Sequence, residues 1–227
     1  MTEYSSSPSG FVFDLRNEER LLESGYIMIR NLLDEEEVSK IRQSLETSEE
    51  LQKNAFGVAD ENGKASKLVI WKHPGNDVTG MLGRCEKVVS TCEKIIRGSH
   101  KCGRIEHKKV GGQTGADIER VELIKKKFPL EHVEMNPGDA LFFHSNLLHA
   151  SNANNSDLRR WTLLSCYCKA SNDTVTPHCL PSYTPLRKVP DSAIRECTSL
   201  DCSGKEFMDP EKDVNIKSTS GDKGKSS

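Results

Sequence analysis

The 227-residue sequence lacks several features that mark particular classes of protein. It has almost no net charge, because 32 basic residues offset 34 acidic ones, so no overall field draws it to nucleic acid or to an anionic membrane. It has no apolar run of membrane-spanning length. Its N-terminus also lacks the basic region followed by an apolar region that marks a secretory signal peptide. Its last three residues, Lys-Ser-Ser, are not the peroxisomal tripeptide. We therefore expect a cytoplasmic protein without nucleic-acid or membrane partners; no pattern indicates the oligomeric state.

The eight cysteines include no C-x-x-C pair, which disfavours a zinc protein. The chain is also too long, and too rich in ordinary core patterns, to need disulfide bonds for its stability. Cys166 and Cys168 flank Tyr167 in a segment expected to be a strand, so both should point to the same face. We expect these two small thiols to pack in the core rather than to bind a metal.

The length favours one domain with terminal tails. Residues 1–10 are rich in serine and proline, so we expect them to be disordered. Residues 11–190 should form the folded domain, and residues 191–227 a polar, largely disordered tail.

The N-terminal half combines a strand with capped helices. "GYIMIRNLL" (25–33) predicts a buried strand, and Asp34 with Glu37 forms a capping-box pattern at the start of a helix. Asp77 can cap a second helix, in which apolar residues recur at helical spacing as far as Ile95. This second pattern predicts one long helix.

The C-terminal half reads mainly as strands. Charges alternate at helical spacing in residues 116–128 and predict a short exposed helix. Short apolar segments separated by turn residues then predict strands at 131–135, 140–145, 147–151 and 160–168. Helices followed by a strand meander favour an α+β fold, a β-sandwich or jelly roll with N-terminal helices packed on one face.

Three polar residues lie around the last predicted turn. His149 ends an apolar strand, Ser151 projects on the same face, and Arg160 returns close by if residues 152–157 form a turn. Arginine can bind a carboxylate through two parallel hydrogen bonds, and a serine hydroxyl can add a third. The three residues could thus hold a metal ion beside a carboxylate ligand. A structural histidine and a surface Arg160–Asp157 pair explain the same spacing equally well.

The segment "VEMNPGDALFFHSNLLHASNANNSDLRRWTLLSCY" (133–167) resembles the C-terminal half of the phytanoyl-CoA dioxygenase family. "GSHKCGRIEH" (98–107) and "GYIMIRNLLDEEEV" (25–38) also resemble stretches of that family, and the resemblance covers about residues 20–190. It implies a double-stranded β-helix of the jelly-roll or cupin kind. It also implies a hydroxylase that uses Fe(II) and 2-oxoglutarate to act on a small molecule. Within the family, the sequence most resembles proline hydroxylase-like members.

By the same resemblance, His149 is a metal ligand, Arg160 holds the distal carboxylate of 2-oxoglutarate, and Ser151 assists it. His144 and His100 are expected to line the pocket.

The family's other two metal ligands form a His-x-Asp motif, which occurs nowhere in this chain. The sequence passes directly from a helical pattern ending at Ile95 to Arg97, where the family has several strands, so we expect an internal truncation near residues 95–97 and missing central strands. His132-Val133-Glu134 has the form His-x-carboxylate, but it matches a family strand without ligands. We therefore expect a dioxygenase-family chain that binds iron poorly and is inactive or impaired. The alternative is a non-catalytic keto-acid-binding or regulatory pseudoenzyme.

Overall fold

A computed structural model describes residues 3–6, 11–59, 65–89, 105–110, 113–128, 130–150, 154, 156–172 and 184–209. No helix among these residues is long and apolar enough to span a membrane. His100, Ser151 and the junction at 95–97 lie outside the described residues, and so does the end of the chain after residue 209.

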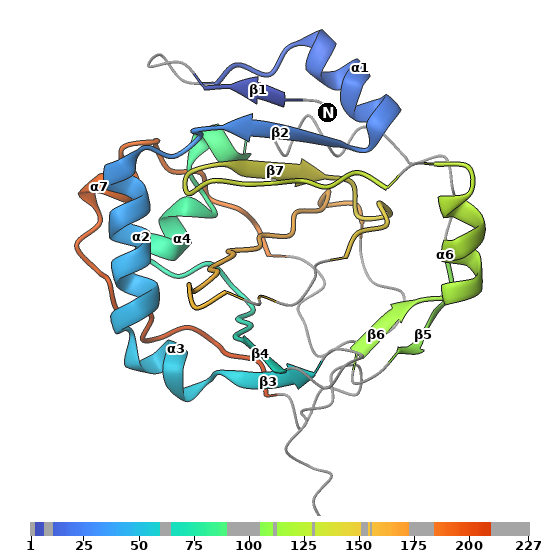
Figure 1. Cartoon of the computed structure of the whole chain (residues 1–227). Helices are drawn as coiled ribbons and strands as arrows, with labels where there is room; N and C mark the ends of the chain where they lie inside the picture. Colours follow the sequence, from blue (N-terminus) through green and yellow to red (C-terminus); the bar gives the residue numbers. More distant parts are fainter. Residues whose placement is uncertain are drawn as a thin grey trace, which may run out of the picture.

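A three-stranded sheet in the order β1-β2-β7 lies at the top of the molecule in Figure 1. β1 (Glu3–Ser5) runs parallel to β2 (Tyr26–Arg30), and β7 (Ala140–Phe143) pairs with β2 antiparallel. Ile27, in the middle of β2, is fully buried, as a strand covered on both faces should be. The strands predicted within 25–33 and 140–145 are thus confirmed. The predicted disorder of residues 1–10 is wrong for β1, because its backbone finds a partner in β2.

Helix α1 (Leu15–Ser24) packs over this sheet, and α2 (Glu35–Thr47) follows β2 (Figure 1). The predicted capping box of α2 is confirmed, since the Asp34 carboxylate accepts from Glu37 N and the Glu37 carboxylate accepts from Asp34 N. The buried Glu37 carboxylate also lies 2.7 Å from Lys87 Nζ, so one side chain both caps α2 and pairs with the segment that follows α4.

The long helix predicted from Asp77 to Ile95 is interrupted. Helix α4 (Val78–Leu82) ends after little more than one turn, Gly83 and Arg84 form a turn, and residues 86–89 are helical again. Between them the Cys85 backbone forms a bridge with Val189 in the C-terminal part of the chain. The helix is thus interrupted where the Cys85 backbone pairs with Val189, although the apolar spacing indicated one continuous helix.

The C-terminal residues 184–209 pack against the N-terminal helices. Helix α7 (Ala193–Glu196) contacts α2 and α4, and the three helices lie together on the left of Figure 1. Ile194 and Cys202 are completely buried in their common apolar cluster. The predicted disordered tail from residue 191 is therefore wrong for residues 191–209, because a few apolar residues in a polar sequence are enough to fasten it.

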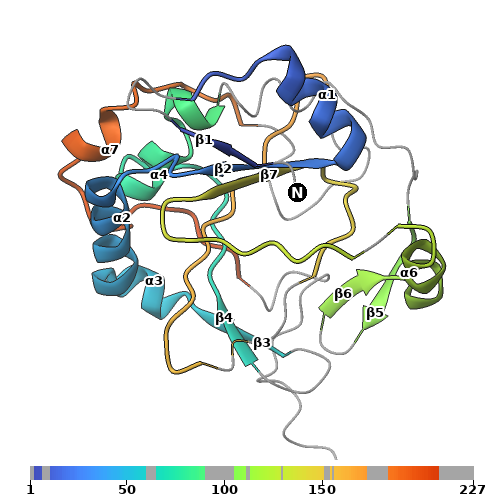
Figure 2. The ribbon, with the colours of Figure 1, turned by 45° about the horizontal axis from the view of Figure 1, so that its top comes forward.

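Four short elements form a second region of small sheets. Strands β3 (Phe56–Ala59) and β4 (Ala65–Leu68) form one hairpin, and β5 (His107–Val110) and β6 (Gln113–Ala116) form another. A short helix (α3, Glu49–Lys53) precedes β3. Figure 2 shows the β5–β6 hairpin beside α6 (Ile118–Lys125), which has no buried residue and confirms the predicted exposed helix.

Three predicted strands are absent from the described residues. Residues 131–135, 147–150 and 160–168 carry no strand, although their sequences alternate as strands do. A strand needs a neighbouring backbone with which to pair, and among the described strands β7 has only β2 beside it. The structure thus shows a mixed α/β fold with small sheets, and the double-stranded β-helix stays an expectation.

The Asn-Pro-Gly-Asp turn before β7 is fastened to the end of β2. The Asp139 carboxylate lies 2.6 Å from Arg30 Nη1 and accepts hydrogen bonds from the backbone N atoms of Asn31 and Asn136. Gly138 has a φ of 93°, and its carbonyl accepts a hydrogen bond from Leu33 N. The turn thus determines where β7 enters the sheet.

Gly138→Ala is expected to lower the free energy of unfolding by more than the roughly 1–2 kcal/mol that a left-handed backbone costs an L-residue. The added Cβ would lie only 2.5 Å from the Leu33 carbonyl oxygen. Gly204→Ala is the matched control, because Gly204 has a φ of 80° but nothing within 4 Å of the added atom. Urea unfolding of the two variants should separate the cost of the left-handed backbone, which both share, from the cost of the contact with the Leu33 carbonyl, which only Gly138→Ala has. Equal losses of unfolding free energy in the two variants would contradict this account of the turn.

Candidate functional site

His149 is exposed and makes only local contacts among those that the structure gives for its ring. Its Nδ1 atom lies 2.9 Å from the Leu147 carbonyl oxygen, and its ring packs at 55° to the ring of Phe143 with 4.8 Å between the centroids. Because Phe143 is the last residue of β7, this contact places the histidine near the C-terminal end of that strand. The Nε2 atom is the ring nitrogen that would serve as a ligand.

His144 is half-buried, and its backbone is held by a hydrogen bond from His144 N to the Gly25 carbonyl. Its Nδ1 atom accepts a hydrogen bond from Asn146 N at 3.0 Å, which fixes the ring within the turn after β7. The ring thereby has a structural role, and its predicted role in lining a pocket stays a prediction.

Arg160 is exposed, in the segment that carries no strand. Ser151 and His100, the other predicted site residues, are outside the described part of the chain. The predicted closeness of Arg160 to Ser151 therefore stays an expectation. Of the sequence-derived site, the structure places one candidate ligand, one candidate carboxylate-binding residue and one neighbouring histidine.

The donor set around His149 does not suit iron. Two histidines and one carboxylate on one face are the ligands that hold non-haem Fe(II) in oxygenases of this type. Within the described ranges, no group of three or more His, Cys, Asp or Glu side chains could hold a metal ion. His132 and Glu134, which could have supplied a substitute pair, are both exposed on a segment without regular structure. The described residues thus do not form the expected centre.

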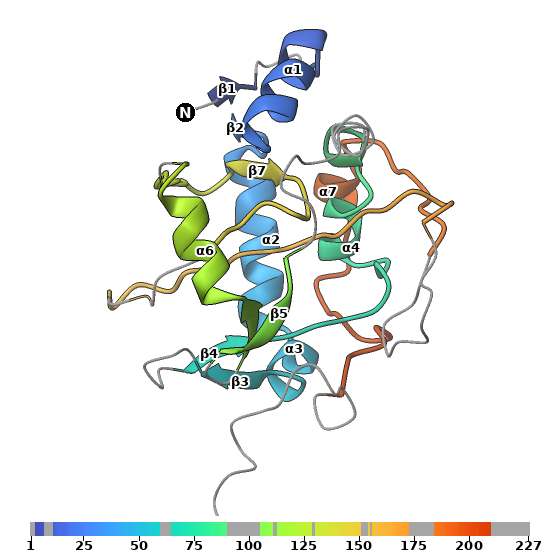
Figure 3. The ribbon, with the colours of Figure 1, turned by 90° about the vertical axis from the view of Figure 1, so that its right-hand side faces the viewer.

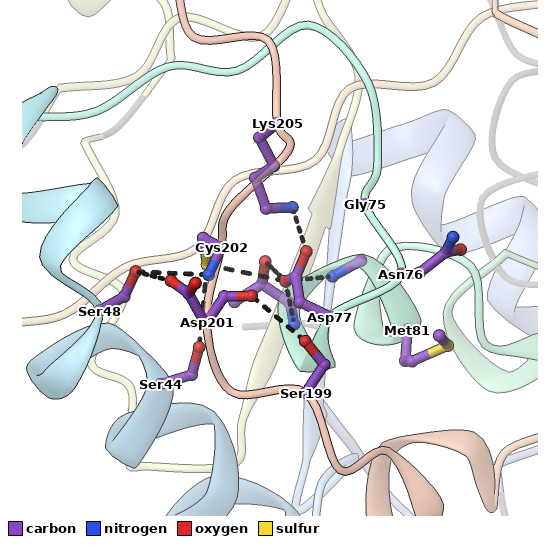
Figure 4. A network of polar contacts seen from close by, with 12 residues as sticks. Ser44, Ser48, Gly75, Asn76, Asp77, Met81, Ser199, Asp201, Cys202 and Lys205 are labelled. Carbon is purple, nitrogen blue, oxygen red and sulfur yellow. Dashed lines mark hydrogen bonds and ion pairs between the residues drawn. The ribbon is translucent and has the colours of Figure 1, made fainter.

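A polar network that the sequence did not reveal lies in the core instead (Figure 4). Asp77 caps α4 by accepting from Thr79 N and Gly80 N through Oδ1, and its other carboxylate oxygen lies 2.9 Å from Lys205 Nζ. The side chains of Asp77 and Lys205 are 3% and 0% exposed. The Lys205 ammonium also lies over the Trp71 ring, 4.7 Å from its centroid. This pair joins the C-terminal segment to the start of α4.

Two further polar groups extend the network toward α2. The Cys202 thiol lies 3.7 Å from Asp77 Oδ1 and 3.8 Å from Ser44 Oγ, and Ser44 donates to the Leu200 carbonyl. Burial and the Asp77 carboxylate raise the pKa of Cys202, which keeps the thiol protonated. These contacts join the C-terminal segment to α2 and α4, so we regard the network as a structural centre. Only the Asp77 cap had a sequence signal.

The pKa of Asp77 reflects opposing influences. Burial alone would raise it, but the hydrogen bond from Thr79 and the ion pair with Lys205 lower it, and the net result is a pKa below the ordinary 3.8. The carboxylate is therefore charged at neutral pH, as an ion pair with a buried lysine requires.

Comparisons with known proteins agree with the family resemblance over part of the chain. The family model "Phytanoyl-CoA dioxygenase (PhyH)" matches residues 78–161. A Caenorhabditis elegans protein described as "Probable phytanoyl-CoA dioxygenase" is 33% identical over 78 residues, which is 34% of this chain and 25% of that protein. The chain thus matches about a quarter of the length of this curated relative. No solved structure matches.

Over residues 78–161 the chain is thus similar to the phytanoyl-CoA dioxygenase family. The matched region begins at α4 and ends just after Arg160, so it contains His149 and Arg160 and also spans the junction at 95–97.

Proposed function

We propose that this chain is an internally shortened Fe(II)- and 2-oxoglutarate-dependent dioxygenase of small molecules that does not hold iron in its present form. The observation that carries the proposal is the combination of a family match over residues 78–161 with the absence of any His-x-Asp sequence. His149 is then the one remaining metal ligand, and Arg160 with Ser151 the remaining keto-acid-binding residues. Removal of two of three anchoring ligands takes away most of the chelate and its only negative charge.

The surface of the described chain supports the loss of a central segment. Exposed large apolar side chains concentrate between residues 118 and 164 and include Leu130, Leu158 and Leu164, which are 69%, 78% and 68% exposed. Large apolar side chains normally pack against another layer of the fold. We infer that a longer form of the protein has strands that cover them and complete a double-stranded β-helix.

A pseudoenzyme remains the second candidate. Arg160 is exposed, and carboxylate binding by arginine does not depend on iron. In that case the chain would bind a keto acid as a regulatory partner and would never turn it over.

Anaerobic calorimetric titration tests both candidates. With Fe(II), we expect the unaltered chain to show no saturable binding, because a single imidazole is a weak anchor. The titration of His149→Ala should therefore look the same. With 2-oxoglutarate alone, Arg160-dependent binding would favour the pseudoenzyme, and Arg159→Ala is the matched control for loss of surface charge. Stoichiometric Fe(II) binding by the unaltered chain would overturn the proposal.

The genomic sequence separates the same candidates at the level of the gene. The interval between the codons for Ile95 and Arg97 should contain an in-frame segment that encodes His-x-Asp. A contiguous exon across these codons would instead favour a chain that evolved without the motif.

A further inference from the structure

The segment 160–168 follows a stretched path across the molecule and belongs to no sheet, as the gold trace in Figure 3 shows. Its anchor is Tyr167, which packs against the core cluster of the β1-β2-β7 sheet and donates a hydrogen bond from its hydroxyl to the Gly83 carbonyl at 2.8 Å. Ser165 lies on the same side, since its Oγ atom is 3.6 Å from the position that a Cβ atom on Gly83 would take. Leu163 is half-buried as well. Leu163 and Tyr167 are thus the half-buried residues of the segment, and Ser165, although exposed, lies on their side.

The residues between them face away. In an extended chain successive side chains point to opposite sides, so Cys166 and Cys168 project from the side opposite to Tyr167. Both cysteines are exposed and carry free thiols. The expectation that they pack in the core is therefore wrong: the side they share is the outer one, because the larger Tyr167 takes the inner side. Their α-carbons should be roughly 6.6 Å apart, two steps of about 3.3 Å.

Two thiols on one side of a short extended segment can reach a single ion between them. Thiolates are soft ligands that select ions such as Cu(I) and Zn(II). Zinc, however, takes four ligands in structural sites and three protein ligands in catalytic sites. Within the described ranges, no third His, Cys, Asp or Glu side chain completes a metal-binding group with this pair. Two thiolates by themselves suit an ion that is satisfied by two soft ligands, which is characteristic of monovalent copper.

We propose that Cys166 and Cys168 form a two-coordinate surface site for a soft monovalent cation of the copper(I) class. Binding releases two protons: two thiols and one Cu(I) ion give a bis-thiolate complex with a net charge of −1, with no change in oxidation state. The exposed Lys169 lies next to the site and provides a nearby positive charge. This site is independent of the proposed dioxygenase ancestry, because it uses neither His149 nor Arg160.

The test is an anaerobic titration of the reduced, full-length chain with Cu(I) buffered by a chromophoric chelator. We expect the wild-type chain to take up one equivalent more than Cys166→Ser/Cys168→Ser. Each single serine variant should bind that equivalent roughly tenfold or more weakly, because loss of one thiolate removes the chelate. Cys197→Ser, which changes a partly exposed thiol elsewhere in the chain, is the matched control and should leave uptake unchanged.

A trivalent arsenical supplies a second measurement, since one arsenic atom bonds stably to two thiols but not to one. Intact-mass analysis should show one adduct that needs both Cys166 and Cys168. Since both residues are exposed, their serine variants should unfold at the same urea concentration as the wild-type chain. Equal copper uptake by the wild-type and double-serine chains, or single variants that each keep half of the capacity, would overturn the proposal.

Discussion

The purified chain, supplied with Fe(II), 2-oxoglutarate, ascorbate and O₂, is expected to consume 2-oxoglutarate no faster than a protein-free control. Oxygenases of this type need two histidines and a carboxylate on one iron, and the chain contains no His-x-Asp motif. We expect a chain without this set of metal ligands to lack the reaction altogether rather than to perform it slowly. Succinate or ¹⁴CO₂ release from labelled 2-oxoglutarate is the measurement.

His149→Ala separates this expectation from a merely slow enzyme. If the residual signal comes from free iron, the variant and the unaltered chain should give the same background rate. Robust turnover that His149→Ala abolishes would contradict the proposed loss of function. The missing ligands would then have to be sought among His132, Glu134 and His144. A chain with the family's internal segment restored should show activity that does depend on His149.

Asp77→Asn is expected to destabilise the fold by about 3–5 kcal/mol, the usual effect of leaving one buried charge without its partner. Asparagine caps helices as well as aspartate does, so the start of α4 keeps its hydrogen bonds. What is lost is the charge that faces the Lys205 ammonium, whose side chain is fully buried. Urea unfolding followed by far-UV circular dichroism gives the difference.

The double variant Asp77→Asn/Lys205→Met is the control, because it removes both charges and keeps an apolar side chain over Trp71. Most of the lost stability should return. If Asp77→Asn costs less than about 1 kcal/mol, the pair does not fasten the C-terminal segment.

Acid should remove the same stabilisation. The folded pKa of Asp77 lies below its ordinary 3.8, so the charge stabilises the fold above about pH 4 and ceases to do so as the pH falls through the folded pKa. The difference between wild type and Asp77→Asn should therefore shrink under acidic conditions.

The sequence predicted local features well where a short motif has a single physical outcome. The Asp34–Glu37 capping box, the Asp77 cap and the buried strand at β2 were all predicted, because capping and continuous apolar burial depend on residues near one another in sequence. The family resemblance also came from sequence, and the match over residues 78–161 supports it.

Prediction from the sequence failed where a segment needs a neighbouring strand in order to become a strand itself. Residues 160–168 alternate as a strand does, yet they form none, because alternation reports the preference of a segment and not the presence of a neighbour. Cys166 and Cys168 were expected inside and lie outside, because alternation does not say which side of the segment faces the core, and Tyr167 takes that side.

By itself, then, the sequence determined where α2, α4 and the β2 strand begin, which family the chain resembles and which metal ligands it lacks. Only the tertiary structure decided that Lys205 and Cys202, which lie in a segment with no pattern of its own, are buried against Asp77. Such a contact joins residues more than a hundred positions apart, and its stability comes from burial and charge in the assembled core, which no local spacing encodes.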